Sequence, residues 1–338
     1  MTEHGKPPQQ SRDGPSPIPF VGPVHAGPEQ FNTAERKVGA NPCWLEKHGA
    51  DDTITAMPGG APFNVARACS RLGAPVGLVA SVSTDHFGQR LMADLDADGV
   101  HTDRLQRTDL PTTLAVAALD AAGTATYRFY LQGTSAAALT TVPLSTNTRA
   151  VVAGGLGLAV EPMAIAVERM VRGAGDDVLV LVDLNCRPDA AGDRDRYLGR
   201  LQRVLVRADA VKASIEDLRY VDPEDSPTVV AERLVAGRTR AVLLTAGAAA
   251  TTAVTAAATR AVPVVGTPVV DTIGAGDSFT AALLTWWIAN GHSVDDLADV
   301  EAVVPAVVAA HQAAAVTVGR RGADPPHRGH LPPDWCPG

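Results

Sequence analysis

Regular patterns of apolar and polar positions begin after about the first 50 residues of the chain. Apolar side chains recur every three or four positions over residues 62–72, which predicts a helix, and the apolar run 76–82 predicts a short strand. Residues 84–85, Thr-Asp, can cap a second helix, which the pattern ends at Gly99. The chain thus enters its folded part with helix, strand and helix in succession.

The second half of the chain alternates short apolar runs with helical patterns. Residues 178–184 form a continuous apolar run, VLVLVDL, typical of a parallel strand that is covered on both faces. Shorter runs at 210–213 and 241–245 repeat the pattern, with helical segments at 194–208 and 227–237 between them. Strand–helix alternation of this kind predicts an α/β domain with a mostly parallel sheet.

Two strand-like runs, 112–119 and 124–131, are rich in β-branched and aromatic residues and joined by a Gly-containing turn, which predicts a hairpin. Residues 1–50 are rich in Pro, Gly, Gln and His without periodicity, and are predicted to be a weakly structured or aberrant extension. We therefore expect one domain over 51–324, followed by a Pro-rich tail over 325–338 that wraps the surface or frays.

Composition narrows the class of protein. The net charge of −8 argues against a general electrostatic grip on nucleic acid or anionic lipid. The four cysteines form no C-x-x-C pair, which argues against a zinc ribbon or a disulfide scaffold and suits a reducing cytoplasm. No signal peptide or uninterrupted membrane span is predicted. These features predict a soluble cytoplasmic protein.

The segment 269–284, VVDTIGAGDSFTAALL, is the most informative for chemistry. Gly274, Ala275 and Gly276 let successive backbone N–H groups converge at the start of a predicted helix, which makes a site for a phosphoryl group or another developing anion. Asp277 follows in the first turn. It is either a structural helix cap or a base that takes a proton from an attacking hydroxyl.

A second Gly-rich segment, GGAPFN, covers residues 59–64. Gly59 and Gly60 allow close backbone approach, and the amide of Asn64 offers donors and an acceptor that suit polyol hydroxyls. The alternative is a Gly-rich turn in which Asn64 ties down the loop.

Together these two segments resemble the ribokinase-like, phosphofructokinase-B-type carbohydrate kinases, in the form most similar to bacterial fructokinases. The resemblance covers about residues 57–324 and implies a Rossmann-like, mostly parallel sheet flanked by helices, with a small β-sheet lid that includes 112–131. Intermediate segments that resemble family landmarks are 83–88 (STDHFG), 183–188 (DLNCRP) and 245–247 (TAG).

The resemblance implies an ATP-dependent sugar kinase in which Asp277 activates a primary hydroxyl, and the amides of residues 274–277 hold the transferred phosphoryl group. It places Thr245, Gly247 and Asn185 at the nucleotide. Fructose is the expected acceptor, with 6-phosphate as the product. The alternatives are 2-keto-3-deoxygluconate, ribose, a nucleoside or another small polyol, or a family member that binds sugar or nucleotide without catalysis.

Further roles are implied in the same way. Glu216 and Asp217 fall where the family positions hydrated Mg²⁺, and which acid does so stays open. The alternative for this segment is a helix capped by Ser214. Arg187 follows a predicted strand end, where open α/β sheets bind ligands, and it either contacts phosphate or substrate or pairs with a nearby acid. A monovalent cation near Asp271 and a homodimer formed through the lid are expected on the resemblance alone.

One departure from the family pattern concerns the start of the chain. The family opens with a strand of the type V-x-G-E-x-x-x-D, whose Asp binds sugar hydroxyls 15–25 residues before the paired glycines. Residues 37–49 hold that place here, where Val-Gly at 38–39 is a remnant at most and Trp44 stands at the Asp position. We therefore expect a missing first strand, with Glu46, Asp51 or Asp52 as substitutes for the carboxylate, or a compromised sugar site.

Overall fold

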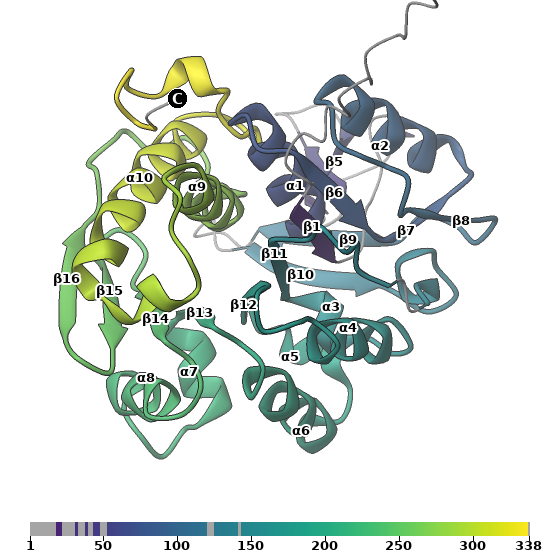
Figure 1. Ribbon diagram of the computed structural model, residues 1–338. Helices are drawn as coiled ribbons and strands as arrows, with labels where there is room; N and C mark the ends of the chain where they lie inside the picture. The colour runs from purple at the N-terminus through teal and green to yellow at the C-terminus, as the bar shows by residue number, and fades with distance from the viewer. Residues whose placement is uncertain are drawn as a thin grey trace, which may run out of the picture.

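The computed structural model describes residues 18–21, 31–32, 38–39, 43–47, 53–119, 125–140 and 143–336. Its centre is an eight-stranded sheet in the order β16-β15-β14-β13-β12-β11-β1-β6 (Figure 1). The six strands from β14 to β6 run parallel, and β15 and β16 continue the sheet antiparallel. The strands are β1 (Ile18–Val21), β6 (Val76–Val79), β11 (Ala150–Gly154), β12 (Leu179–Asp183), β13 (Ala210–Ser214), β14 (Ala241–Thr245), β15 (Ala250–Thr255) and β16 (Thr259–Pro263).

Helices cover both faces of this sheet, as two separate groups of buried apolar side chains show. One face carries α1 (Ala61–Arg71), α2 (His86–Ala97), α9 (Ala275–Ala289) and α10 (Val300–Val318). The other carries α3 (Leu156–Ala159), α4 (Met163–Arg172), α5 (Pro188–Ala191), α6 (Arg194–Leu205), α7 (Ile215–Val221) and α8 (Pro227–Val235). All residues of β6 and β12 are buried, as expected for strands covered on both sides. The predicted α/β fold class is confirmed.

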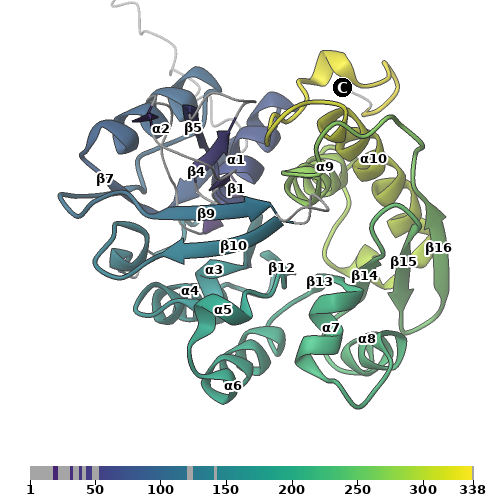
Figure 2. The ribbon, with the colours of Figure 1, turned by 180° about the vertical axis from the view of Figure 1, so that it is seen from behind.

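Smaller sheets lie beside the main one. The predicted hairpin is confirmed as β9 (Leu114–Leu119) and β10 (Ala125–Tyr130), while its turn at 120–123 lies outside the described residues. β3 (Val38–Gly39) pairs with β9, and β2 (Phe31–Asn32), β5 (Thr53–Pro58) and β4 (Cys43–Lys47) form another sheet. Figure 2 shows β9 and β10 as long arrows above α3 and α5. The predicted strand 76–82 ends at Val79, and β7 (Ser81–Ser83) pairs separately with β8 (Gln106–Thr108).

The expectation of a missing first strand is wrong. Ile18–Val21 lies in the main sheet between β6 and β11 and pairs in parallel with both. Val38–Gly39 is not a remnant of that strand, because it joins β9 at the side of the main sheet. The segment 1–50 therefore supplies one central strand and edge strands of the smaller sheets. Asp51 and Asp52 lie outside the described residues.

The carboxyl-terminal elements pack on one side of the sheet. By length and composition α10 could cross a membrane, with a mean hydropathy of 1.4, but half of that stretch is buried and it packs along α9. The Pro-rich tail wraps over this layer. Leu331 and Trp335 are buried, and the Trp335 indole donates a hydrogen bond to the Ala309 carbonyl at 2.9 Å. Arg71 of α1 binds the Pro325 carbonyl at 2.9 Å, which attaches the start of the tail.

Candidate active site

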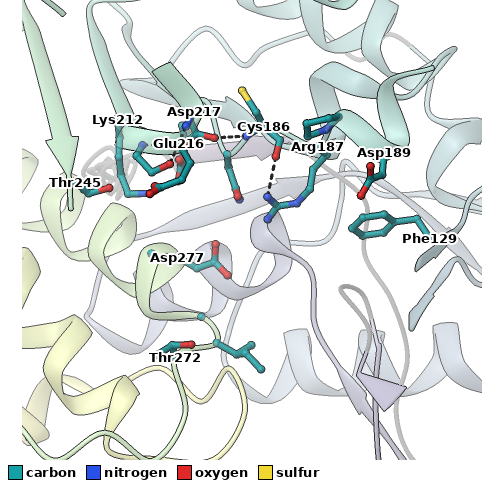
Figure 3. A pocket seen from close by; sticks show the side chains of 17 residues that line it. Phe129, Cys186, Arg187, Asp189, Lys212, Glu216, Asp217, Thr245, Thr272 and Asp277 are labelled. Carbon is teal, nitrogen blue, oxygen red and sulfur yellow. Dashed lines mark hydrogen bonds and ion pairs between the residues drawn. The ribbon is translucent and has the colours of Figure 1, made fainter. Parts of the chain in front are cut away.

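The carboxyl ends of β12, β13 and β14 meet the start of α9 around a cavity of about 610 Å³ (Figure 3). Ligands of open α/β sheets bind at this edge, because the loops that follow the parallel strands open there. Figure 3 shows Asp277 facing Arg187 across the space, with Lys212 and Glu216 toward one end and Phe129 at the other. Segments almost 150 residues apart in the chain are thereby brought to one cavity, since Phe129 and Asp277 both line it.

The start of α9 is open to an anion. Gly274 precedes the helix in the left-handed conformation, with φ of 73°, and no side chain caps the helix. The first N–H groups of an α-helix have no partner within the helix, and they carry its positive dipole end. Gly274 and Gly276 line the cavity, while Ala275 faces a neighbouring one. The four residues predicted to hold a phosphoryl group, Gly274, Ala275, Gly276 and Asp277, thus lie together at one helix end.

Asp277 is only 9% exposed and is held by one short contact from a distant helix. The Asn64 amide of α1 donates a hydrogen bond to its Oδ2 at 2.7 Å. Burial raises the pKa of Asp277 to about 6; the Asn64 bond opposes that rise, the nearby Asp183 adds to it, and Lys212 and Arg187 lower it. A carboxylate with this pKa is ionised at neutral pH yet can still accept a proton, as a general base must.

The other polar atom of the Asn64 side chain, Oδ1, is buried and lacks a hydrogen-bond partner among the described residues. Buried polar atoms are nearly always paired, so an acceptor left open beside Asp277 suits a hydroxyl donor from a ligand. Gly59 and Gly60 precede α1, and Gly60 has φ of 116°, a value that L side chains rarely adopt. Gly60 allows the turn that presents Asn64, and neither glycine is among the described residues that line the cavity.

The loop after β12 carries Asn185, Cys186 and Arg187, and all three line the cavity. Arg187 donates to the Cys186 carbonyl at 3.0 Å, which leaves the rest of its guanidinium for a ligand. Asn185 has φ of 39°, so the backbone turns sharply at this point. Burial raises the pKa of the Cys186 thiol to about 12, and the thiol is therefore unreactive.

The two acids predicted for Mg²⁺ have different surroundings. Asp217 is buried, and its carboxylate accepts from the Cys186 amide at 2.6 Å and the Ser214 amide at 2.8 Å. Ser214 in turn caps α7, so the two residues form a capping box. Glu216 is exposed and lines the cavity. Asp217 thus joins two loops of the site, and Glu216 is the acid that faces solvent.

A second cavity of about 410 Å³ adjoins the first. Thr245 and Gly247 of the β14 loop line it, and its remaining wall is mainly apolar. Gly247 has φ of 57° and no atom within 4 Å of where a side chain would start, so the backbone there is open. The two cavities share four lining residues: Lys212, Thr245, Thr272 and Gly276.

Lys212 is a site residue to which the sequence analysis assigned no role. It lies in β13, is 8% exposed, and its Nζ is 2.7 Å from Asp183 Oδ2. Thr280 of α9 donates to the same carboxylate oxygen at 3.1 Å. The sequence feature that could have indicated a role for Lys212 is its position inside a predicted buried strand, because a buried charge needs a partner or a function.

The arrangement can therefore activate a hydroxyl and stabilise an anion beside it. A buried carboxylate such as Asp277 can accept a proton from a hydroxyl, and the open end of α9 with the nearby cations can hold an anionic group. Two adjoining cavities, one polar and one mainly apolar, provide room for two reactants. This is the combination that phosphoryl transfer from a nucleotide to an alcohol requires.

Comparison with known proteins agrees with this geometry. The chain is 31% identical to a fructokinase of Rhizobium leguminosarum bv. trifolii over 229 residues, which is 67% of this chain and 70% of that protein. It is 31% identical to a fructokinase of Klebsiella pneumoniae, covering 80% of this chain and 88% of that one. Among solved structures, a fructokinase of Xylella fastidiosa with bound ATP superposes with a TM-score of 0.78 at 26% identity, covering 93% of this chain and 94% of that one.

A family model agrees with these relatives. The model described as pfkB family carbohydrate kinase matches residues 37–328, a span that contains Asn64, Asp183, Lys212 and Asp277. The chain belongs to the pfkB family of carbohydrate kinases.

Proposed function

We propose that this protein transfers the γ-phosphoryl group of ATP to the 6-hydroxyl of fructose, giving ADP and fructose 6-phosphate. The observation that carries the proposal is Asp277, a buried carboxylate beside the uncapped start of α9 where two cavities meet. The fructokinase relatives and the ATP-bound structure of one of them favour fructose and ATP as the reactants.

In this proposal the acceptor hydroxyl gives its proton to Asp277 as its oxygen attacks the γ-phosphorus. The bond from that phosphorus to the β–γ bridging oxygen breaks, and ADP leaves with the electron pair. The amides of Gly274, Ala275, Gly276 and Asp277 hold the phosphoryl oxygens. Asn64 orients Asp277 and accepts a bond from a sugar hydroxyl.

The remaining site residues divide between the two reactants. Arg187 faces Asp277 across the larger cavity and binds a phosphate or sugar oxygen there. Asn185 lies in the same loop at the phosphate end of the nucleotide. Thr245 and Gly247 form the loop that receives the nucleotide in the smaller cavity.

The side chains at this site suit a Mg²⁺ ion that is bound through its own water molecules. The described residues hold no group of three or more His, Cys, Asp and Glu side chains that could bind a metal directly. Mg²⁺ commonly keeps several waters and is held by one or two carboxylates together with substrate phosphates. Glu216, being exposed at the cavity, would hold such a hydrated ion, and the ion would neutralise charge on the nucleotide phosphates.

Glu216→Gln and Asp217→Asn are expected to separate metal binding from structure. Glu216→Gln raises the Mg²⁺ concentration needed for half-maximal turnover several-fold and leaves thermal stability unchanged, since Glu216 is exposed. Asp217→Asn loses an acceptor for one of two backbone amides and costs about 1–3 kcal/mol of stability. Mg²⁺ titrations of turnover and thermal unfolding measure both effects. Equal Mg²⁺ dependence in wild type and Glu216→Gln would contradict the metal role.

Asn64→Ala is expected to weaken sugar binding and shift the pH profile. The wild-type kcat/KM falls as pH drops through about 6, because Asp277 must be ionised to act as a base. Loss of the Asn64 bond raises the pKa of Asp277 further, so the falling limb moves to higher pH, while the sugar KM rises about tenfold or more.

The measurement is kcat/KM against pH for wild type, Asn64→Ala and a matched control, Asn290→Ala. The Asn290 side chain bonds the Trp286 carbonyl at 2.8 Å at the far end of α9, so its loss leaves the profile in place. An Asn64→Ala profile that coincides with the wild-type one would show that the contact with Asp277 has no role in catalysis.

A non-catalytic or weakly binding protein is the second candidate, and the sequence after β1 favours it. The first strand ends at Val21, and residues 22–28 contain no Asp or Glu, although the family pattern places its sugar-binding Asp after this strand. We therefore infer a high sugar KM for this chain.

Turnover rates with fructose, 2-keto-3-deoxygluconate, ribose and nucleosides test which acceptor is phosphorylated, and thermal shifts with each sugar and with ATP reveal binding without turnover.

The expected monovalent cation and homodimer stay predictions. The Asp271 carboxylate already accepts from the Ile273 amide at 3.0 Å and the Gly322 amide at 2.8 Å. The bond from Gly322 joins the loop before α9 to the loop after α10, so a cation bound nearby would act on the shape of the anion site. Turnover in potassium against tetramethylammonium salts measures the cation effect, and sedimentation measures the oligomeric state.

A further inference from the structure

Lys212 is the buried cation at the junction of the two cavities. It is one of four residues that line both, and it is the one among them with a charged side chain. A phosphoryl group that passes from a nucleotide in one cavity to an acceptor in the other must cross this junction. We propose that Lys212 is a catalytic residue that binds the phosphoryl group during its transfer, a role that rests on the proposed kinase function.

The placement of Nζ supports a direct contact. A Cβ built on Gly276 would lie 3.4 Å from Lys212 Nζ, so the ammonium group lies against the backbone of the anion site. Gly276 and Asp277 contribute the amides of that site, and the ammonium group is therefore beside the position where the phosphoryl oxygens are held. The absence of a side chain at Gly276 keeps this approach open.

The hydrogen bonds of Lys212 leave donors for a ligand. An ammonium group has three N–H donors, and the hydrogen bond that Nζ makes with the described residues is the one to Asp183. Asp183 also accepts from Thr280, and this pair fixes the ammonium group in place. Two donors remain beside the anion site, where a phosphoryl group can accept them.

A purely structural ion pair accounts less well for the residue. Buried ion pairs are often no more stabilising than apolar side chains of similar volume, so stability alone does not call for one here. The chain contains 25 arginines and four lysines, and Lys212 is the one lysine after residue 47. Arginine pairs with a carboxylate through two parallel bonds, whereas lysine binds a phosphoryl group as a compact point charge. The use of lysine at this position suits the second task.

Lys212 transfers no proton in this role. The acceptor proton goes to Asp277, the new bond forms between the acceptor oxygen and the γ-phosphorus, and ADP leaves with the electron pair of the broken bond. Lys212 stays protonated and offsets the charge that collects on the phosphoryl oxygens. Loss of one preorganised donor of this kind lowers kcat by about 10²–10³-fold in enzymes.

The first test is steady-state kinetics of Lys212→Met with MgATP and the best acceptor. We expect kcat to fall about 10²–10³-fold with the acceptor KM changed less than threefold. The matched control is Arg207→Met, which removes another buried cation from its carboxylate partner, Asp209, at 2.8 Å. Arg207 lies before the opposite end of β13, so this variant loses stability and keeps the wild-type kcat. A Lys212→Met kcat within threefold of wild type would overturn the proposal.

A second test uses the wild-type protein and does not depend on a folded variant. An acyl phosphate of ATP carries a reactive carbonyl on its γ-phosphate. The small unprotonated fraction of a lysine amine in contact attacks that carbon and gives a proton to solvent, the carbon–oxygen bond to the phosphate breaks, and ATP is released. We expect acylation of Lys212, blocked by excess MgATP and detected by peptide mass spectrometry. Labelling confined to Lys6, Lys37 and Lys47 would place Lys212 away from the γ-phosphate and overturn the proposal.

The two tests separate this proposal from the kinase function. If the wild type phosphorylates no acceptor but Lys212 is acylated and protected by MgATP, the nucleotide placement holds and the acceptor assignment fails. If the wild type is active and Lys212→Met equals it, the kinase function holds and the role of Lys212 fails.

Discussion

Asp277→Asn is expected to lower turnover by about 10²–10⁴-fold while raising the thermal stability of the protein at pH 7 to 8. The loss follows from removing the general base, whose contribution is commonly of this size. The gain in stability follows from burial, which raises the pKa of Asp277 from 3.8 to about 6. Loss of activity together with a gain in stability is the pattern expected for an active-site group that is held in the fold at a cost to stability.

The size of the stability effect depends on pH. Because the pKa is higher in the folded state, the folded protein favours the protonated carboxyl group. The contribution that the protonated Asp277 carboxyl group makes to stability is full below about pH 4 and is lost as pH rises through about 6. At neutral pH the charged carboxylate therefore costs up to about 3 kcal/mol, at about 1.4 kcal/mol for each pKa unit.

Thermal unfolding of wild type and Asp277→Asn at pH 4 and pH 8, beside ADP release at pH 8, measures both effects. We expect a higher Tm for the variant at pH 8 and equal Tm values at pH 4. A variant that keeps wild-type turnover would exclude Asp277 as the base. A variant less stable than wild type at pH 8 would mean that the carboxylate is well compensated in the folded state.

Gly274→Ala is expected to lower kcat about 10²-fold or more through the backbone of the anion site. Gly274 has φ of 73°, and a Cβ there would lie 2.7 Å from the Cβ of Ala323 and 2.8 Å from its Cα. The start of α9 or the loop around Ala323 must move, and a displacement of about 1 Å at a reacting group can cost about 10²-fold in rate.

The matched control is Gly291→Ala, at the other end of the same helix. Gly291 has φ of 75°, but no atom lies within 4 Å of its Cβ position. This variant carries the left-handed backbone cost of about 1–2 kcal/mol without a clash near the site. We expect both variants to lose stability and Gly274→Ala alone to lose kcat. Equal kcat values in the two variants would show that the backbone at Gly274 does not shape the anion site.

The chemistry at 274–277 could be predicted from the sequence because it is contiguous. Glycines, an acid and a helix start follow one another, and each has a local physical reason. The bond between Asn64 and Asp277 could not be predicted from the residues alone, since 213 positions separate them and only the packing of α1 against α9 brings them together.

The first strand of the sheet was missed for a local reason. Ile18–Val21 is four residues long and contains Pro19, which lowers the strand propensity of so short a segment. Its place in the sheet comes from tertiary context, because β6 and β11 offer parallel edges on both sides. Short central strands of this kind are specified by their neighbours more than by their own sequence.

The site residues show the same division between local and distant signals. The sequence left open whether Ser214 caps a helix and whether the two acids after it bind a metal. In the structure the Asp217 carboxylate accepts hydrogen bonds from two backbone amides, and Glu216 is exposed. A role for Lys212 could be inferred only from the structure, in which its side chain lies between two cavities and beside the start of α9.

The most direct test of the account is ADP release by the wild-type protein from MgATP, measured with and without fructose, together with the sugar phosphate formed. We predict that ADP release depends on fructose and that one fructose 6-phosphate appears for each ADP. ADP release at the same rate without any sugar, or none with any acceptor although ATP binds and stabilises the fold, would contradict the assignment of a sugar kinase active through Asp277.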